Sequence, residues 1–121
     1  MYHASGVLCG VTFLMHLAAA VERPTGVRGL RPCVVVAGGR EPPHWEAYPG
    51  HQFLHTIGAL PCCATGGCWR SRAVPLQDGS KHDHSLCEYP VDGFPLCMQL
   101  VTPDRVVDAV MMYGGRRWSI A

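Results

Sequence analysis

Apolar residues gather in a few short stretches of the chain, and each stretch predicts one structural element. In the first, Ser5 to Cys9 predicts a short strand, and Thr12 is a suitable N-cap for a helix from Phe13 to Glu22 that Pro24 ends. Three alanines, Ala18 to Ala20, would let this helix lie close against a sheet. Its predicted apolar positions, at helical spacing, are Phe13, Leu14, Leu17, Ala18 and Val21.

Two further strands and a second helix follow. Cys33 to Ala37 is a continuous apolar run between Pro32 and two glycines, a pattern typical of a buried parallel strand, and His51 to Ile57 predicts another strand. Thr102 and Pro103 supply a cap and a first-turn proline for a helix through Met112, with Gly114 and Gly115 as its stop. The predicted inner face of that helix consists of Val106, Val107, Val110 and Met111.

The stretch from Pro61 to Pro95 is rich in Cys, Gly and Pro and has no sustained periodicity. We expect a Cys-rich loop region there, which extends to Cys97 and so covers residues 61–97.

Strand, helix, strand and closing helix predict an α/β sheet, which binds ligands outside the carboxyl ends of its strands. One candidate site is the turn around Thr12. The other is Gly38 to Glu41, where Arg40 can pair with phosphate, although an exposed turn is the simpler interpretation.

The predicted helix N-terminus has chemistry suited to a diphosphate. Its unpaired N–H groups and partial positive charge attract anions, the Thr12 hydroxyl can donate a hydrogen bond, and His16 lies one turn further on. The competing interpretation is an ordinary N-cap threonine and a structural histidine.

Composition limits the organisation and the partners. With 121 residues, 48% of them hydrophobic and 16% charged, the chain can form one core, so we expect a single domain over residues 1–121. The net charge of +1, without a basic stripe, argues against nucleic acid as a partner. The apolar run from Gly6 to Val21 is shorter than the roughly 20 residues that cross a bilayer, so no membrane span is expected.

Seven cysteines are unusually many for this length and normally indicate disulfides or a metal site. Five of them supply enough thiolates for a structural zinc site: Cys62, Cys63, Cys68, Cys87 and Cys97. The paired C-x2-C knuckles of a zinc ribbon are missing, so disulfides or plain packing fit the spacing equally well. His82 and His84 lie nearby and are candidate substitute ligands, while a solvated polar loop is the alternative.

The amino-terminal apolar run also allows a secreted protein. It ends in Ala18-Ala19-Ala20, and cleavage there would leave six cysteines and a small disulfide-framework binding protein. Against this, the first three residues contain no Lys or Arg, and His16 falls within the apolar run. We therefore expect a cytoplasmic location, with secretion as the alternative.

Several segments resemble one enzyme family. Gly10-Val11-Thr12-Phe13-Leu14-Met15-His16-Leu17-Ala18-Ala19-Ala20 is similar to the "G-x-D-T-G-x-x-H-L-A-A-A" element of the ADP-heptose:lipopolysaccharide heptosyltransferases and their bacterial relatives. Pro32 to Pro42 resembles the family's "P-x-V-x-L-F-G-x-x-x-P" strand and turn, and Cys97 to Val106 resembles its late "C-M-x-x-I-x-P-x-x-V" helix start. Trp45 to Thr56 and Cys62 to Arg72 look like a Cys-rich branch found in planctomycetes.

The resemblance implies the C-terminal half of a GT-B glycosyltransferase, a partial doubly wound, Rossmann-like sheet that holds a nucleotide-diphosphate sugar of the ADP-heptose type. Thr12, Phe13 and His16 match the family's donor-binding positions. Val11 and Phe13 depart from the pattern, standing where the family has Asp and Gly. The family's acceptor site, for a glycan or lipid-linked acceptor, and its general base belong to a separate N-terminal domain. We therefore assign no catalytic residue and expect no activity from this chain alone.

Overall fold

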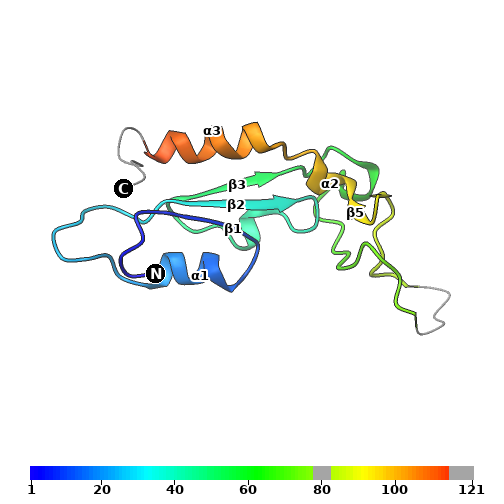
Figure 1. Cartoon of the computed structure of the whole chain (residues 1–121). Helices are drawn as coiled ribbons and strands as arrows, with labels where there is room; N and C mark the ends of the chain where they lie inside the picture. The colour runs from blue at the N-terminus through cyan, green and yellow to red at the C-terminus, as the bar shows by residue number, and fades with distance from the viewer. Residues whose placement is uncertain (78–82, 115–121) are drawn as a thin grey trace.

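A three-stranded parallel sheet in the order β1-β2-β3 forms the centre of the fold (Figure 1). The structure is a computed structural model and describes residues 1–77 and 83–114. The strands are β1 (Val7–Gly10), β2 (Cys33–Gly38) and β3 (His51–His55), with Val7 opposite Cys33 and Cys33 opposite His51. This parallel sheet with its helices confirms the expected α/β fold class.

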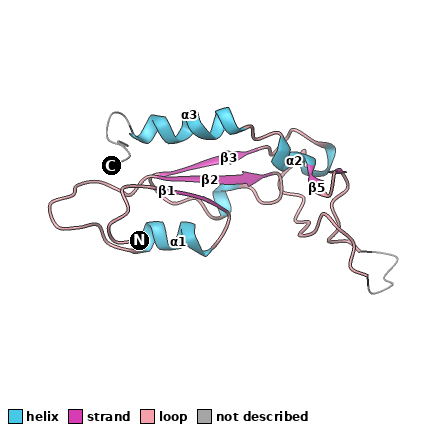
Figure 2. Cartoon of the chain, viewed as in Figure 1, coloured by secondary structure: helices cyan, strands magenta, loops and turns pink. Residues whose placement is uncertain are grey.

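Helices cover both faces of the sheet, with α1 (Phe13–Ala20) on one side and α3 (Pro103–Gly114) on the other (Figure 2). The side chains of β2 alternate between these layers, as strand geometry requires. Cys33 and Val35 pack with α1, whereas Val34 packs with α3. Burial on both faces explains the continuous apolar run that predicted this strand.

The helix α1 begins at the predicted cap but buries a different face. The Leu14 backbone N–H donates to Thr12 Oγ1 at 3.3 Å, which confirms the cap. The helix ends at Ala20 rather than Glu22, and its buried residues are Met15 and Ala18, one turn apart. The predicted apolar face was wrong in its first turn, because Phe13 and Leu14 are 70% and 49% exposed.

Arg31 closes the carboxyl end of α1, a role that the sequence did not indicate. Only 4% of the residue is exposed, and Nη1 donates to the carbonyl oxygens of Ala18 at 3.0 Å and Val21 at 2.6 Å. Nη2 donates to the Glu22 carbonyl oxygen at 2.9 Å. The guanidinium therefore satisfies carbonyl groups that every helix end leaves unpaired.

The helix α3 starts as predicted, since the Arg105 backbone N–H donates to Thr102 Oγ1 at 3.3 Å. Its inner face is only partly the predicted one. Ala109 is buried, and Val106 and Val110 pack against the β2 core. The other two predicted members, Val107 and Met111, are 57% and 56% exposed, because residues at positions i, i+3 and i+4 share a face and those two lie beside it.

The Cys-rich region, residues 61–97, lies beyond the carboxyl ends of β2 and β3 (Figure 1). Its described residues contain four short elements: η2 (Pro61–Cys63), β4 (Pro90–Val91), β5 (Phe94–Pro95) and the start of α2 (Leu96–Gln99). A further short turn, η1 (Pro43–Trp45), follows β2. His82 and Gly115 lie outside the described residues.

The amino-terminal apolar run supplies two elements of this core. It provides β1 and α1, and Met15 is fully buried against the sheet. Removal of the first 20 residues would take both elements out of the fold. No helix among residues 1–77 and 83–114 is long and apolar enough to cross a membrane.

Candidate functional site

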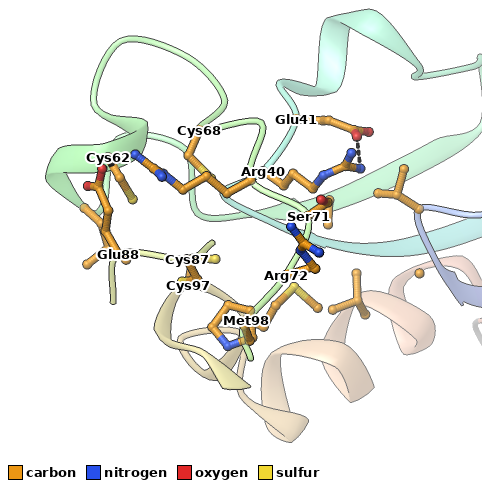
Figure 3. Close-up of a pocket in the computed structure, with 18 of the residues that line it drawn as sticks. Arg40, Glu41, Cys62, Cys68, Ser71, Arg72, Cys87, Glu88, Cys97 and Met98 are labelled. Carbon is orange, nitrogen blue, oxygen red and sulfur yellow. Dashed lines mark hydrogen bonds and ion pairs between the residues drawn. The ribbon is translucent and has the colours of Figure 1, made fainter. Parts of the chain in front are cut away.

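A pocket of about 300 Å³ opens at the carboxyl edge of the sheet, between the strand ends and the Cys-rich region (Figure 3). This volume falls at the lower end of the range for small-molecule sites. Val11, Val36, Leu60 and Met98 are among its apolar walls. The polar and charged lining residues are Thr12, Arg40, Glu41, Arg70, Ser71, Arg72 and Glu88, with the thiols of Cys62, Cys68, Cys87 and Cys97.

The strand ends position one side of this pocket. Gly10 ends β1, and the next two residues lead directly into the N-terminus of α1, so that Thr12 lines the pocket while it caps the helix. After β2, the turn Gly38 to Glu41 brings Arg40 and Glu41 to the same cavity. Both turns that the sequence singled out as ligand sites therefore meet at one pocket.

Three arginines from two segments surround the cavity, and each forms an ion pair. Arg40 pairs with Glu41, Arg70 with Glu88, and Arg72 with Asp83. Arg70 Nη1 also donates to the carbonyl oxygens of His84 and Leu86, both at 3.0 Å, which fixes its guanidinium. Arg40 has a side chain 47% exposed and is the arginine best placed to turn toward a ligand.

The Cys-rich region docks on the β2 turn through its backbone. The Cys68 N–H donates to the Gly39 carbonyl oxygen at 3.1 Å, and the Trp69 N–H donates to the Arg40 carbonyl oxygen at 3.0 Å. At Gly67 the two backbones approach so closely that a Cβ would lie 2.1 Å from the Arg40 carbonyl oxygen. Only glycine fits there, and the contact holds the two sides of the pocket together.

Two tryptophans lie together on the surface beside this docking point. The rings of Trp45 and Trp69 are 5.0 Å apart at 71°, and the residues are 67% and 48% exposed. Trp69 has φ of 58°, in the left-handed region that a bulky residue seldom adopts. With this exposure, the two residues lie on the surface and do not close the core.

A second polar group forms next to the pocket around His16. Its Nδ1 and the Tyr48 hydroxyl share a hydrogen bond of 3.0 Å, and the Tyr48 ring meets the His51 ring edge to face at 5.2 Å. Burial, with a smaller effect from His16, lowers the pKa of His51. Burial and the neighbouring Glu41 carboxyl, which shares a hydrogen bond with Glu46, raise the pKa of Glu46, whereas His16 and Arg40 oppose that rise.

The raised pKa of Glu46 predicts a pH dependence of stability. The folded chain holds this proton more tightly than the unfolded chain, so the associated stabilisation is complete below the ordinary pKa of 4.5 and is lost as the pH rises through the folded value. The variant Glu46→Gln keeps a neutral side chain at every pH. We therefore expect its melting temperature, relative to the wild type, to increase as the pH rises from 4 toward about 7.

The matched control is Glu22→Gln, which removes one exposed carboxylate far from Glu41. The experiment measures melting curves of the wild type and both variants at a series of pH values. The lowered pKa of His51 acts in the opposite direction, because it costs stability below the ordinary value of 6.5. His51 is present in all three proteins, so its effect cancels in the difference between Glu46→Gln and the wild type. A constant difference between Glu46→Gln and wild type across that range would contradict the assigned Glu41–Glu46 interaction.

The predicted donor-binding residues do not all lie in the pocket. Thr12 lines it, while Phe13 is mostly exposed and His16 turns toward Tyr48. The residues Arg70 and Arg72 were missed. Their spacing of two was an available signal, because alternate residues of an extended segment project to the same side.

The cysteines fall into two groups, and all seven carry free thiols. Cys9 and Cys33 lie in the sheet core with sulfurs 4.0 Å apart. The five predicted metal ligands gather at the Cys-rich end, where four line the pocket and Cys63 is buried beside it. As the described side chains are placed, no three His, Cys, Asp or Glu residues are close enough together to hold a metal ion.

We compared the chain with protein families, curated proteins and solved structures. No family model, no curated protein and no solved structure matches the chain.

Proposed function

We propose that the chain binds a nucleotide-diphosphate sugar at the carboxyl edge of its sheet, as the donor-binding part of a GT-B glycosyltransferase resembling the heptosyltransferases. The observation that carries this proposal is the convergence of the α1 N-terminus and Arg40 at one pocket at the ends of β1 and β2. Open α/β sheets bind nucleotides at this edge. The sugar acceptor and the general base would come from a further domain.

The chemistry of the pocket supports a diphosphate rather than a neutral ligand. Thr12 offers a hydroxyl donor, the α1 N-terminus contributes a partial positive charge, and a guanidinium can bind phosphate oxygens in a bidentate manner. The Arg40 side chain is 47% exposed, so its guanidinium has room to turn from Glu41 toward a phosphate. The apolar walls, such as Val36 and Met98, suit a sugar ring or part of the nucleoside.

The test is calorimetric titration of the chain with ADP-heptose and other nucleotide-diphosphate sugars. Arg40→Ala is expected to raise the Kd about ten- to a hundredfold, since a hydrogen bond to a charged group contributes roughly 1.5–3 kcal/mol. Thr12→Val should weaken binding as well. On the resemblance we also expect His16→Ala to lose affinity, either through the ligand or through its hydrogen bond with Tyr48.

Arg28→Ala is the matched control, because it removes the same charge from an exposed loop away from the pocket. Its Kd should stay within about twofold of the wild type, well inside the effect of a lost charged hydrogen bond. Absence of heat with every nucleotide-diphosphate sugar, or equal losses from Arg28→Ala and Arg40→Ala, would count against the proposal.

A further inference from the structure

The two exposed tryptophans beside the pocket, Trp45 and Trp69, form an aromatic platform built from two segments of the chain. Trp45 lies in η1, which follows the β2 turn, and Trp69 lies in the loop that docks on that turn. Their rings meet edge to face with centroids 5.0 Å apart. Such a pair leaves at least one face of each ring uncovered by its partner. Since the residues are 67% and 48% exposed, the platform presents flat apolar area to solvent.

The backbone holds this platform against the pocket. The Trp69 N–H donates to the Arg40 carbonyl oxygen at 3.0 Å, and Trp69 directly precedes Arg70, so the platform adjoins two arginines that line the cavity. Trp69 also has φ of 58°, a conformation that a bulky residue keeps only when its surroundings fix it, and such positions cluster at ligand clamps. The contact that joins the two walls of the pocket therefore also sets the place of the Trp69 ring.

The size of the pocket indicates which part of the ligand would reach the platform. A nucleotide-diphosphate sugar carries a sugar ring, a ribose and a base on its diphosphate. A cavity of about 300 Å³, at the lower end of the range for small-molecule sites, holds the diphosphate and one ring and leaves the base outside. Resting on the proposed donor binding, we infer that the platform of Trp45 and Trp69 stacks against the nucleobase of the donor.

Stacking of this kind supplies affinity without choosing the base. Every nucleobase has a flat π-face, so an exposed indole accepts each of them. A purine covers more of an indole ring than a pyrimidine does, and the platform should therefore favour adenine and guanine about equally and bind uracil less tightly. The diphosphate, held by charge, and the base, held by stacking, thus make separable contributions to the affinity of the donor.

The experiment compares calorimetric titrations with ADP and with inorganic pyrophosphate, which has no base. Trp45→Ala and Trp69→Ala should each raise the Kd for ADP about five- to a hundredfold and leave the Kd for pyrophosphate within about twofold. Trp69→Phe keeps a ring and should recover most of the affinity for ADP. Tyr2→Ala is the control, because Tyr2 is an exposed aromatic residue beside the Arg31 cap, and it should bind both ligands as the wild type does.

The outcomes separate this inference from the proposed function. An unchanged Kd for ADP in both alanine variants would overturn the platform and leave the diphosphate site standing. Equal losses for ADP and pyrophosphate would show that the substitutions disturb the pocket itself, which would also overturn the stacking role. A wild type that binds no nucleotide at all would contradict the proposed function, and the platform with it.

A fluorescence measurement with both platform rings intact guards against a variant that fails to fold. In Trp118→Phe, the remaining tryptophans are Trp45 and Trp69, so all indole emission comes from the platform. A base stacked on an indole quenches its emission, and AMP should therefore quench this signal as it binds, whereas pyrophosphate should not. Emission that stays constant while calorimetry shows AMP to be bound would overturn the inference.

Discussion

Replacement of Arg31 by methionine is expected to lower the free energy of unfolding by about 3 to 5 kcal/mol, one of the largest effects that a single substitution should have in this chain. Arg31 is 4% exposed and its guanidinium donates to carbonyl oxygens of Ala18, Val21 and Glu22 at the end of α1. Nε also donates to the Ala4 carbonyl oxygen at 3.3 Å. Methionine fills much of the volume but leaves these carbonyl groups without a donor.

Urea unfolding followed by circular dichroism measures this loss. Arg28→Met is the control, because Arg28 is exposed, and its effect should stay within about 0.5 kcal/mol. Arg31→Lys keeps the charge but replaces three donor nitrogens with one ammonium nitrogen. Its free energy of unfolding should therefore fall between those of the wild type and Arg31→Met. Equal stabilities of Arg31→Met and Arg28→Met would show that the end of α1 does not depend on this cap.

Local signals in the sequence predicted the elements that follow local rules. The run Cys33 to Ala37 predicted β2 because a strand covered on both faces needs apolar residues at every position. Thr12 and Thr102 were recognised as N-caps because a hydroxyl one position before a helix satisfies an otherwise unpaired N–H. These features depend on neighbours within a few residues, which a single sequence displays directly.

The helix faces were predicted only in part, because they depend on how each helix lies on a narrow sheet. α1 carries apolar residues around most of its circumference, so the spacing did not single out Met15 and Ala18 over Phe13 and Leu14. A sheet of three strands covers only one stripe of each helix, and the remaining apolar side chains stay exposed.

The candidate site was predicted in its strand-end part and missed in its Cys-rich part. The turns at Thr12 and Arg40 follow strands directly, so parallel-sheet geometry predicts that they meet. Arg70 and Arg72 reach the same cavity through contacts between residues distant in the sequence, such as their ion pairs with Glu88 and Asp83. A loop without periodicity gives no indication of such long-range pairing.

The substitution Gly67→Ala is expected to separate the Cys-rich region from the β2 turn. The new Cβ would lie 2.1 Å from the Arg40 carbonyl oxygen and 2.9 Å from the Glu41 Cα, and neither backbone atom can move without shifting the turn itself. We expect loss of the hydrogen bonds that Cys68 and Trp69 donate to this turn, at a cost of about 2 to 3 kcal/mol in the stability of this contact.

Hydrogen exchange checks this expectation residue by residue. The Cys68 and Trp69 amide protons should exchange at least tenfold faster in Gly67→Ala, whereas those of β2 should remain protected, because the sheet core does not include the docking point. Thr65→Ala, an exposed change two residues away, should leave both groups unaltered. Since Arg40 lines the proposed donor site, the same variant should also weaken nucleotide-sugar binding in calorimetry. Unchanged protection of Cys68 and Trp69 would mean that the close backbone approach at Gly67 does not hold the two walls of the pocket together.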